Sequence, residues 1–152
     1  MKTGQQGFTL VELIVVIVIL GLLAATAIPR FINVSNSARA ASVKGLSGGL
    51  ASTVAVVQAA FAAAGGVSGT TTSVSMADGT SVPVTGYGIP TATATTGGIF
   101  VGLGSNALTG FTTSGGATAT GTVTFTPSGG SATCQVVYSG LNGNVTPTTT
   151  GC

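Results

Sequence analysis

Residues 8–28 form a continuous apolar run, FTLVELIVVIVILGLLAATAI, whose single charged residue is Glu12. As an α-helix these 21 residues would be roughly 31 Å long at about 1.5 Å per residue, enough to cross the hydrocarbon core of a membrane. A helix that is apolar on all sides needs lipid or other helices around it. The alternative is a secretory signal peptide cut near the small residues 24–27, but the run is long for one and carries a charge.

The remaining composition shows very little charge. The chain has 152 residues, which suits one modest globular domain plus an accessory element. Charged residues make up 4% of it, against about 25% in an average soluble domain. So little charge protects poorly against association, and it therefore fits a protein whose normal state is assembled. Four cations are too few to bind nucleic acid by neutralising phosphates, and no nucleic-acid partner is expected.

The side chains needed for catalysis are almost absent. The chain has no histidine, so neither a Ser-His nor a Cys-His pair can form. Glu12 and Asp78 are its only carboxylates, and Glu12 lies inside the apolar run. We therefore expect no enzyme, no catalytic residue, no cofactor and no metal or calcium site.

A second, amphipathic helical stretch is predicted over residues 30–64. Apolar residues recur there at spacings of three and four, which places them on one face of a helix. Arg30, Arg39 and Lys44 are interpreted mainly as the solvated face, and Gly65-Gly66 as the stop signal. Together with the apolar run this predicts one helix of about 55 residues. The buried stripe is expected to consist of Val43, Leu46, Leu50, Val54, Val57 and Phe61.

From residue 67 onward the chain is rich in Thr, Ser, Gly and Val and predicts short strands. The clearest pair is 119–126 and 132–138, which alternate apolar and polar residues and are separated by the turn sequence PSGG, so an antiparallel hairpin is expected. Asp78-Gly79 predicts a second turn. The stretches 91–98 and 112–122 are interpreted as long loops. The expected strands are 73–76, 81–84, 99–103, 119–126 and 132–138.

The hexapeptide GFTLVE at residues 7–12, with Lys2 upstream and the apolar run behind it, resembles the processing motif of type IV pilins and type II secretion pseudopilins. Further likeness at residues 27–31, 37–39, 45–46 and 134–138 resembles the mannose-sensitive haemagglutinin branch of type IV pilins. The strong similarity covers about residues 4–50. It implies an α+β type IV pilin fold, in which the apolar half of a long N-terminal helix protrudes and the amphipathic half packs on a small antiparallel sheet.

The resemblance also implies the domain organisation. Residues 1–7 would be a cleaved leader, 8–29 the transmembrane and polymerising half-helix, 30–64 the amphipathic half-helix, and 65–152 a β-sheet head, called the head below. A disulfide loop would close the C-terminal part of the head.

Several residue roles follow from the resemblance. A prepilin peptidase would cut between Gly7 and Phe8 and methylate the new N-terminal amine of Phe8. Glu12 would form an assembly salt bridge with the Phe8 amine of another subunit, besides acting in a capping box with Thr9. The span between Gly21 and Pro29 would lose helicity in the fibre. In an exported chain Cys134 and Cys152 have one intramolecular pairing, so a disulfide is expected.

The implied function is that of a major pilin, the structural subunit of an extracellular filament. Such a filament would serve surface attachment, and motility is a further function that the resemblance allows. The alternatives are a minor pilin, a type II secretion pseudopilin or a tip adhesin. The implied partners are copies of the same chain, the prepilin peptidase and the assembly machinery of the inner membrane. The precursor would reside in the inner membrane, and the mature protein would be part of an extracellular pilus on the bacterial surface.

Overall fold

The computed structural model describes residues 7–69 and 72–152, with no side chain described at 29–33 and 105. The leader residues 1–6 and the side chain of Arg30 therefore lie outside the described residues. The chain divides into two compact units, an N-terminal unit that ends at Ser37 and a C-terminal unit, Ala38–Cys152. The elements follow the order α1 (Leu10–Ala63), β1 (Ser73–Ser75), β2 (Ser81–Pro83), α2 (Gly98–Leu103), η1 (Ser105–Leu108), β3 (Phe111–Gly115), β4 (Thr122–Pro127), β5 (Gln135–Ser139) and β6 (Val145–Thr148).

Helix α1 has 54 residues and contributes to both units. It ends where the glycine pair predicts. Gly65 has a φ of 66°, a left-handed conformation that glycine adopts without strain. Its N–H donates to the Ala62 carbonyl at 3.1 Å, and the Gly66 N–H donates to the Phe61 carbonyl at 3.0 Å. These two bonds form a Schellman motif, which satisfies carbonyls that the end of the helix would otherwise leave unpaired.

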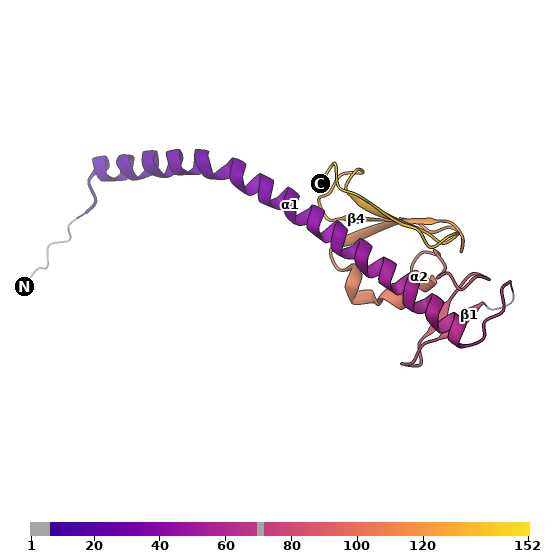
Figure 1. The fold of residues 1–152 in the computed structure, drawn as a ribbon. Helices are drawn as coiled ribbons and strands as arrows, with labels where there is room; N and C mark the ends of the chain where they lie inside the picture. The colour runs from indigo at the N-terminus through magenta and orange to yellow at the C-terminus, as the bar shows by residue number, and fades with distance from the viewer. Residues whose placement is uncertain (1–6, 70–71) are drawn as a thin grey trace, which may run out of the picture. The chain divides into compact units, whose positions relative to one another are not determined.

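The predicted stripe on α1 is the helical wall of the core. Val43, Leu50 and Val57 are completely buried, and Phe61 is partly buried. The first part of the stripe packs on the large sheet, whereas Val57 packs on the β1–β2 hairpin. In Figure 1 the head lies beside this part of α1. The structure thus confirms the amphipathic reading of the second half of the helix.

The head contains two antiparallel sheets. One is the β1–β2 hairpin, and the other has four strands in the order β3-β4-β5-β6. The predicted hairpin is β4–β5, in which Val123 lies opposite Tyr138 and Phe125 opposite Val136. All four of these side chains are completely buried on the face that packs against α1. The α+β class and the long helix on a small antiparallel sheet are therefore confirmed.

One strand prediction is wrong. Residues 99–103 form most of α2 rather than a strand. A short apolar run does not distinguish a buried helix from a buried strand. Here the tertiary surroundings decide, because the Thr91 hydroxyl accepts a hydrogen bond from the Gly98 N–H at 2.8 Å. Gly98 also lies so close to the Pro83 backbone that a Cβ atom would clash with the carbonyl.

Two strands were missed. Strand β3 occupies part of the stretch 112–122 that was interpreted as loop, and β6 follows the hairpin. Both are edge strands of the four-stranded sheet. Most of the β3 side chains are exposed, so no apolar alternation marks it in the sequence. Strand β6 contains Pro147, which an edge strand tolerates because half of its backbone groups have no partner.

Candidate functional site

Glu12 closes the first turn of α1 together with Thr9. The Thr9 N–H and hydroxyl donate to Glu12 Oε2 at 2.9 and 2.8 Å, and the Glu12 N–H donates to the Thr9 hydroxyl at 3.2 Å. This reciprocal pair is the predicted capping box. A carboxylate in the first turn also interacts favourably with the helix dipole. Both described bonds to the carboxylate use Oε2, which leaves Oε1 able to accept from a group outside the chain.

The apolar segment, residues 8–28, has nothing packed against it within the described chain. Phe8 is 88% exposed, and every large apolar side chain along the segment is exposed. The hydroxyl of Thr26, its one polar side chain after Glu12, donates to the Leu23 carbonyl at 2.9 Å and so needs no water. Two stretches of α1 are long and apolar enough to cross a membrane, Leu10–Ile28 and Val34–Ala63, and the second of these is the one that packs partly against the head.

Two glycines of the N-terminal unit make no close contact with the residues that the structure describes. A Cβ atom on Gly7 or on Gly21 would meet no described atom within 4 Å, and neither residue has a left-handed φ. Glycine inside a helix costs roughly 1 kcal/mol relative to alanine, yet α1 runs without interruption through Gly21 and Pro29. Among the described residues, no contact and no backbone conformation therefore requires glycine at these two positions.

The C-terminal unit holds the disulfide pair. Cys134 and Cys152 are bonded, with sulfurs 2.07 Å apart. Cys134 precedes β5 and Cys152 follows β6, so the bond fastens the open end of the β5–β6 hairpin. Around it the Ser131 hydroxyl donates to the Gly151 carbonyl at 2.8 Å. Arg39 of α1 donates from Nη1 to the Cys152 carbonyl at 3.4 Å.

Arg39 thus differs from its predicted role. It is partly buried and anchors the C-terminal loop to α1, whereas Lys44 is exposed as predicted. The sequence had no signal for this bond, because its partner is a backbone carbonyl 113 residues away.

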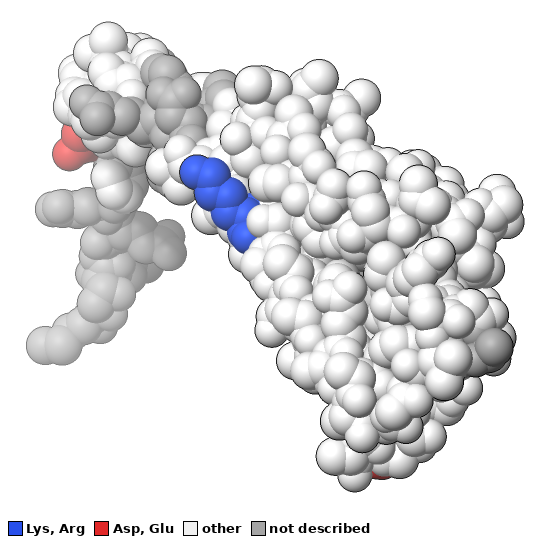
Figure 2. All heavy atoms as spheres, turned by 45° about the vertical axis from the view of Figure 1, so that its right-hand side comes forward, with Lys and Arg blue, Asp and Glu red and all other residues white. Residues whose placement is uncertain are grey.

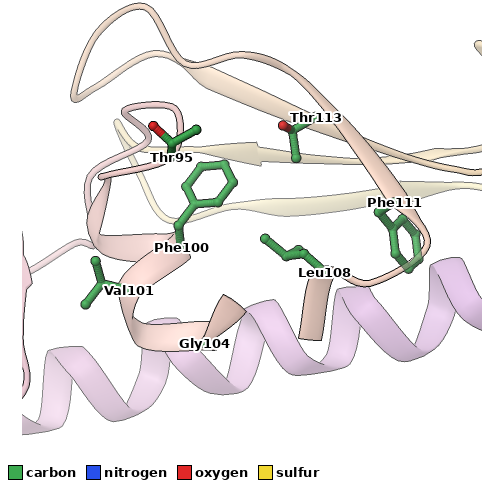
Figure 3. Close-up of a pocket in the computed structure, with 7 residues that line it drawn as sticks. All are labelled: Thr95, Phe100, Val101, Gly104, Leu108, Phe111 and Thr113. Carbon is green, nitrogen blue, oxygen red and sulfur yellow. The ribbon is translucent and has the colours of Figure 1, made fainter. Parts of the chain in front are cut away.

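A hollow of about 480 Å³ opens in the C-terminal unit between α2, η1 and β3. Figure 3 shows Phe100, Leu108 and Phe111 around it, with Thr95 and Thr113 on the side away from α1. Its lining contains no ionisable side chain. Hydroxyls and apolar surface alone provide no group to transfer a proton or to act as an activated nucleophile.

The ionisable groups of the head also have local, structural environments. Burial raises the pKa of the Tyr138 phenol, and its hydroxyl donates to the Pro90 carbonyl. Asp78 is exposed, and the Thr80 N–H that donates to it at 2.9 Å lowers the pKa of its carboxyl. The candidate residues thus form two groups: Gly7, Phe8 and Glu12, which are neighbours in sequence at the start of α1, and the two cysteines, which the fold brings together in the head.

The comparisons agree with the position of this first group. The family described as prokaryotic N-terminal methylation motif matches residues 2–28. A type IV narrow pilus major component, PilA5 of Thermus thermophilus, is 44% identical over 59 residues, which are 39% of this chain and 45% of that protein. A type IV major fimbrial protein, FimA of Dichelobacter nodosus, is 58% identical over 33 residues, which are 22% of this chain and 21% of that protein.

The chain thus spans less than half the length of these curated relatives. No solved structure matches it closely enough to count as similar. The assignment to the mannose-sensitive haemagglutinin branch remains a prediction.

Proposed function

We propose that this chain, whose N-terminal part is similar to type IV pilins, is the major pilin of a type IV pilus, an extracellular filament for surface attachment. One observation carries the proposal. Every large apolar side chain of the apolar segment is exposed, and the single charge of the segment lies in the first turn of the helix. An apolar surface of this size marks a membrane or protein contact. A helix of this kind can lie in a membrane first and pack against the helices of other subunits afterwards.

The precursor is held in the inner membrane by the apolar segment, and a prepilin peptidase cuts it after Gly7. Two features support this step. The fold itself does not need glycine at position 7, so recognition by a partner explains it. The cut also leaves the capping box intact, because the Thr9 N–H that donates to Glu12 belongs to the Phe8–Thr9 peptide bond.

The cut then creates the partner for Glu12. A carboxylate buried among apolar helices without a counter-charge is destabilised by several kcal/mol. Arg30 is 18 residues further along α1, about 27 Å at the rise of an α-helix, so it cannot serve within one chain. The Phe8 amine of a neighbouring subunit can reach the free Oε1 atom while Oε2 keeps its bonds to Thr9. Processing and polymerisation are in this way one mechanism.

In the filament the apolar segments bundle and the heads face water. Copies of the same chain are the main partners, and the inner-membrane assembly machinery extracts each subunit from the bilayer. The span from Gly21 to Pro29 loosens there, because neighbouring helices shelter backbone groups that lipid would leave unsatisfied. Methylation of the Phe8 amine accompanies the cut.

The composition of sheared surface filaments tests the assignment to the major subunit. We expect this chain, without residues 1–7, to be their dominant protein. If it is present only in traces beside another pilin, it is a minor pilin. If it is absent from filaments but needed for secretion, it is a pseudopilin, and the proposal is wrong.

A further inference from the structure

The C-terminal unit has three charged side chains, Arg39, Lys44 and Asp78. Arg39 is engaged with the Cys152 carbonyl. Lys44 and Asp78 are both exposed, and neither forms an ion pair with any residue in the ranges 7–69 and 72–152. Figure 2 shows this scarcity, since the face drawn is almost uniformly white, with one small blue area, one red area at the upper left and a trace of red at the lower edge. Lys44 and Asp78 carry opposite charges and are both exposed. Lys44 of one copy is therefore a candidate to pair with Asp78 of another copy.

These two residues cannot meet within one chain. Asp78 borders a hollow that also includes Gly102, and a Cβ atom on Gly102 would contact Thr53 and Val57 of α1. Lys44 is 9 residues before Thr53 and 13 before Val57, which is roughly 14–20 Å along the helix axis. A lysine side chain does not span that distance. In a second copy displaced along the helix axis, Lys44 can lie beside the hollow of the first copy.

The hollow beside Asp78 has the chemistry of a lysine site. Its volume is about 270 Å³, and Met76, Val82 and Val101 provide apolar walls while the Asp78 carboxylate lies among the lining residues. A lysine combines four methylenes with a terminal ammonium, and it gains most where its stem lies on apolar surface and its charge reaches an acceptor. The Thr80 N–H donates to Asp78 Oδ1 at 2.9 Å, which holds the carboxylate in place, and the exposed carboxylate can accept from a further donor.

The surface next to Lys44 permits close approach. Cβ atoms on Gly45 and Gly48 would meet no described atom within 4 Å, so the head does not use these glycines for packing. Glycine destabilises the interior of a helix, and no contact within residues 7–69 and 72–152 requires glycine at these two positions. Small residues at an exposed helix face let another backbone come near, which suits a docking surface around the lysine.

Resting on the proposed function, we propose that Lys44 of one subunit inserts into the hollow beside Asp78 of another subunit in the filament. The two patches differ, so the contact is heterologous, and each subunit offers one patch to each of two neighbours. Heterologous contacts that do not close into a ring generate open helical assemblies. The head therefore contributes its own directional contact, in addition to the contacts of the apolar segment.

A zero-length carbodiimide cross-linker applied to intact wild-type filaments tests this contact. It joins an amine to a carboxylate as an amide, and the carbodiimide takes up the water that this condensation releases and becomes a urea. Lys44 is the only lysine after Lys2, and Asp78 the only acid after Glu12, so the product can be assigned by mass spectrometry after proteolysis. We expect a Lys44–Asp78 link between subunits, absent from Lys44→Gln filaments. No such link, or one from Lys44 to Glu12, would overturn the contact.

A charge exchange provides the second readout. Lys44→Glu and Asp78→Lys should each lower filament yield at least about threefold, because each places like charges at the contact. The double variant should restore most of the yield, which neither misfolding nor loss of a general surface charge predicts. Full yield from both single variants would contradict the proposal. The wild type distinguishes the proposed function from the Lys44–Asp78 contact. If the wild type forms no filaments, the proposed function is contradicted. If the wild type forms filaments and the single variants do so equally well, only the Lys44–Asp78 contact is contradicted.

Discussion

Glu12 has a capping role at the start of α1 and a proposed role in assembly, and one substitution separates the two. Glu12→Gln keeps an oxygen that can accept from Thr9, so the capping box should survive, while the charge that attracts the Phe8 amine is lost. We expect the variant to be processed and stable in the membrane, with filament yield reduced at least about tenfold, equivalent to 1.4 kcal/mol. Quantifying sheared filaments against membrane-held protein measures this.

Thr9→Ala is the matched control. It removes the Thr9 hydroxyl that the Glu12 N–H uses, at a cost of about 1 kcal/mol to the start of the helix, and it keeps the carboxylate. Filaments should still form. If Glu12→Gln forms filaments normally and Thr9→Ala does not, the carboxylate acts through the cap alone.

We expect Gly7 to be required for cleavage by the peptidase and not for folding. Because a side chain there meets no described atom, Gly7→Leu should leave the fold unchanged while blocking the peptidase. We expect a full-length precursor in the membrane and no filaments, whereas the wild-type intact mass should correspond to a chain that begins at Phe8 and carries one methyl group. A wild-type mass that begins at Met1 or near Ala27 would show that the cleavage site is misassigned.

At the scale of elements, the disulfide staples the β5–β6 hairpin. It closes a loop with a sequence separation of 18, and a loop of that length corresponds to about 3 kcal/mol in the chain-entropy description. The double variant Cys134→Ser, Cys152→Ser should therefore lower the free energy of unfolding by about that amount in a denaturant titration. Strong thiol labelling of native filaments without reductant would contradict the pairing.

The segment between Gly21 and Pro29 is helical in the single chain and is expected to lose helicity in the filament. Pro29 donates no backbone hydrogen bond, and Gly21 lowers the helix propensity, so the span has weak internal support. Gly21→Ala should favour the helix by roughly 1 kcal/mol and hinder assembly without affecting the cut. An unbroken helix across this span in a filament density map would refute the idea.

The elements that the sequence predicted are those whose pattern depends on local physics. The stripe from Val43 to Phe61 and the β4–β5 hairpin each bury one face, so the periodicity of the sequence reports the structure directly. Helix α2 was missed because Thr91 and the Pro83 backbone, both distant in sequence, decide its conformation. The edge strands β3 and β6 show no apolar alternation because little of their surface is buried.

The candidate site divides in the same way. The capping box was predictable because Thr9 and Glu12 are three residues apart. The anchoring bond of Arg39 and the hollow beside Asp78 join segments that only the folded head brings together. Sequence patterns report neighbours along a helix or strand, and they carry no comparable signal for such contacts.

At the scale of the whole molecule, the account depends on an exchange of surroundings for the apolar segment. In the precursor lipid covers it, and in the filament the same segments of other subunits do. Because residues 8–28 contain one acid, these segments have a single electrostatic way to register against one another, in addition to the proposed Lys44–Asp78 contact. The position of Glu12 relative to the neighbouring N-terminus therefore specifies the assembly.

A density map of the native filament at side-chain resolution measures that position directly. The account predicts a core built from residues 8–28, in which the Glu12 carboxylate of each subunit lies within about 4 Å of the Phe8 amine of another, the range of an ion pair. A core in which Glu12 faces only its own Thr9, with every Phe8 amine distant from any carboxylate, would contradict it.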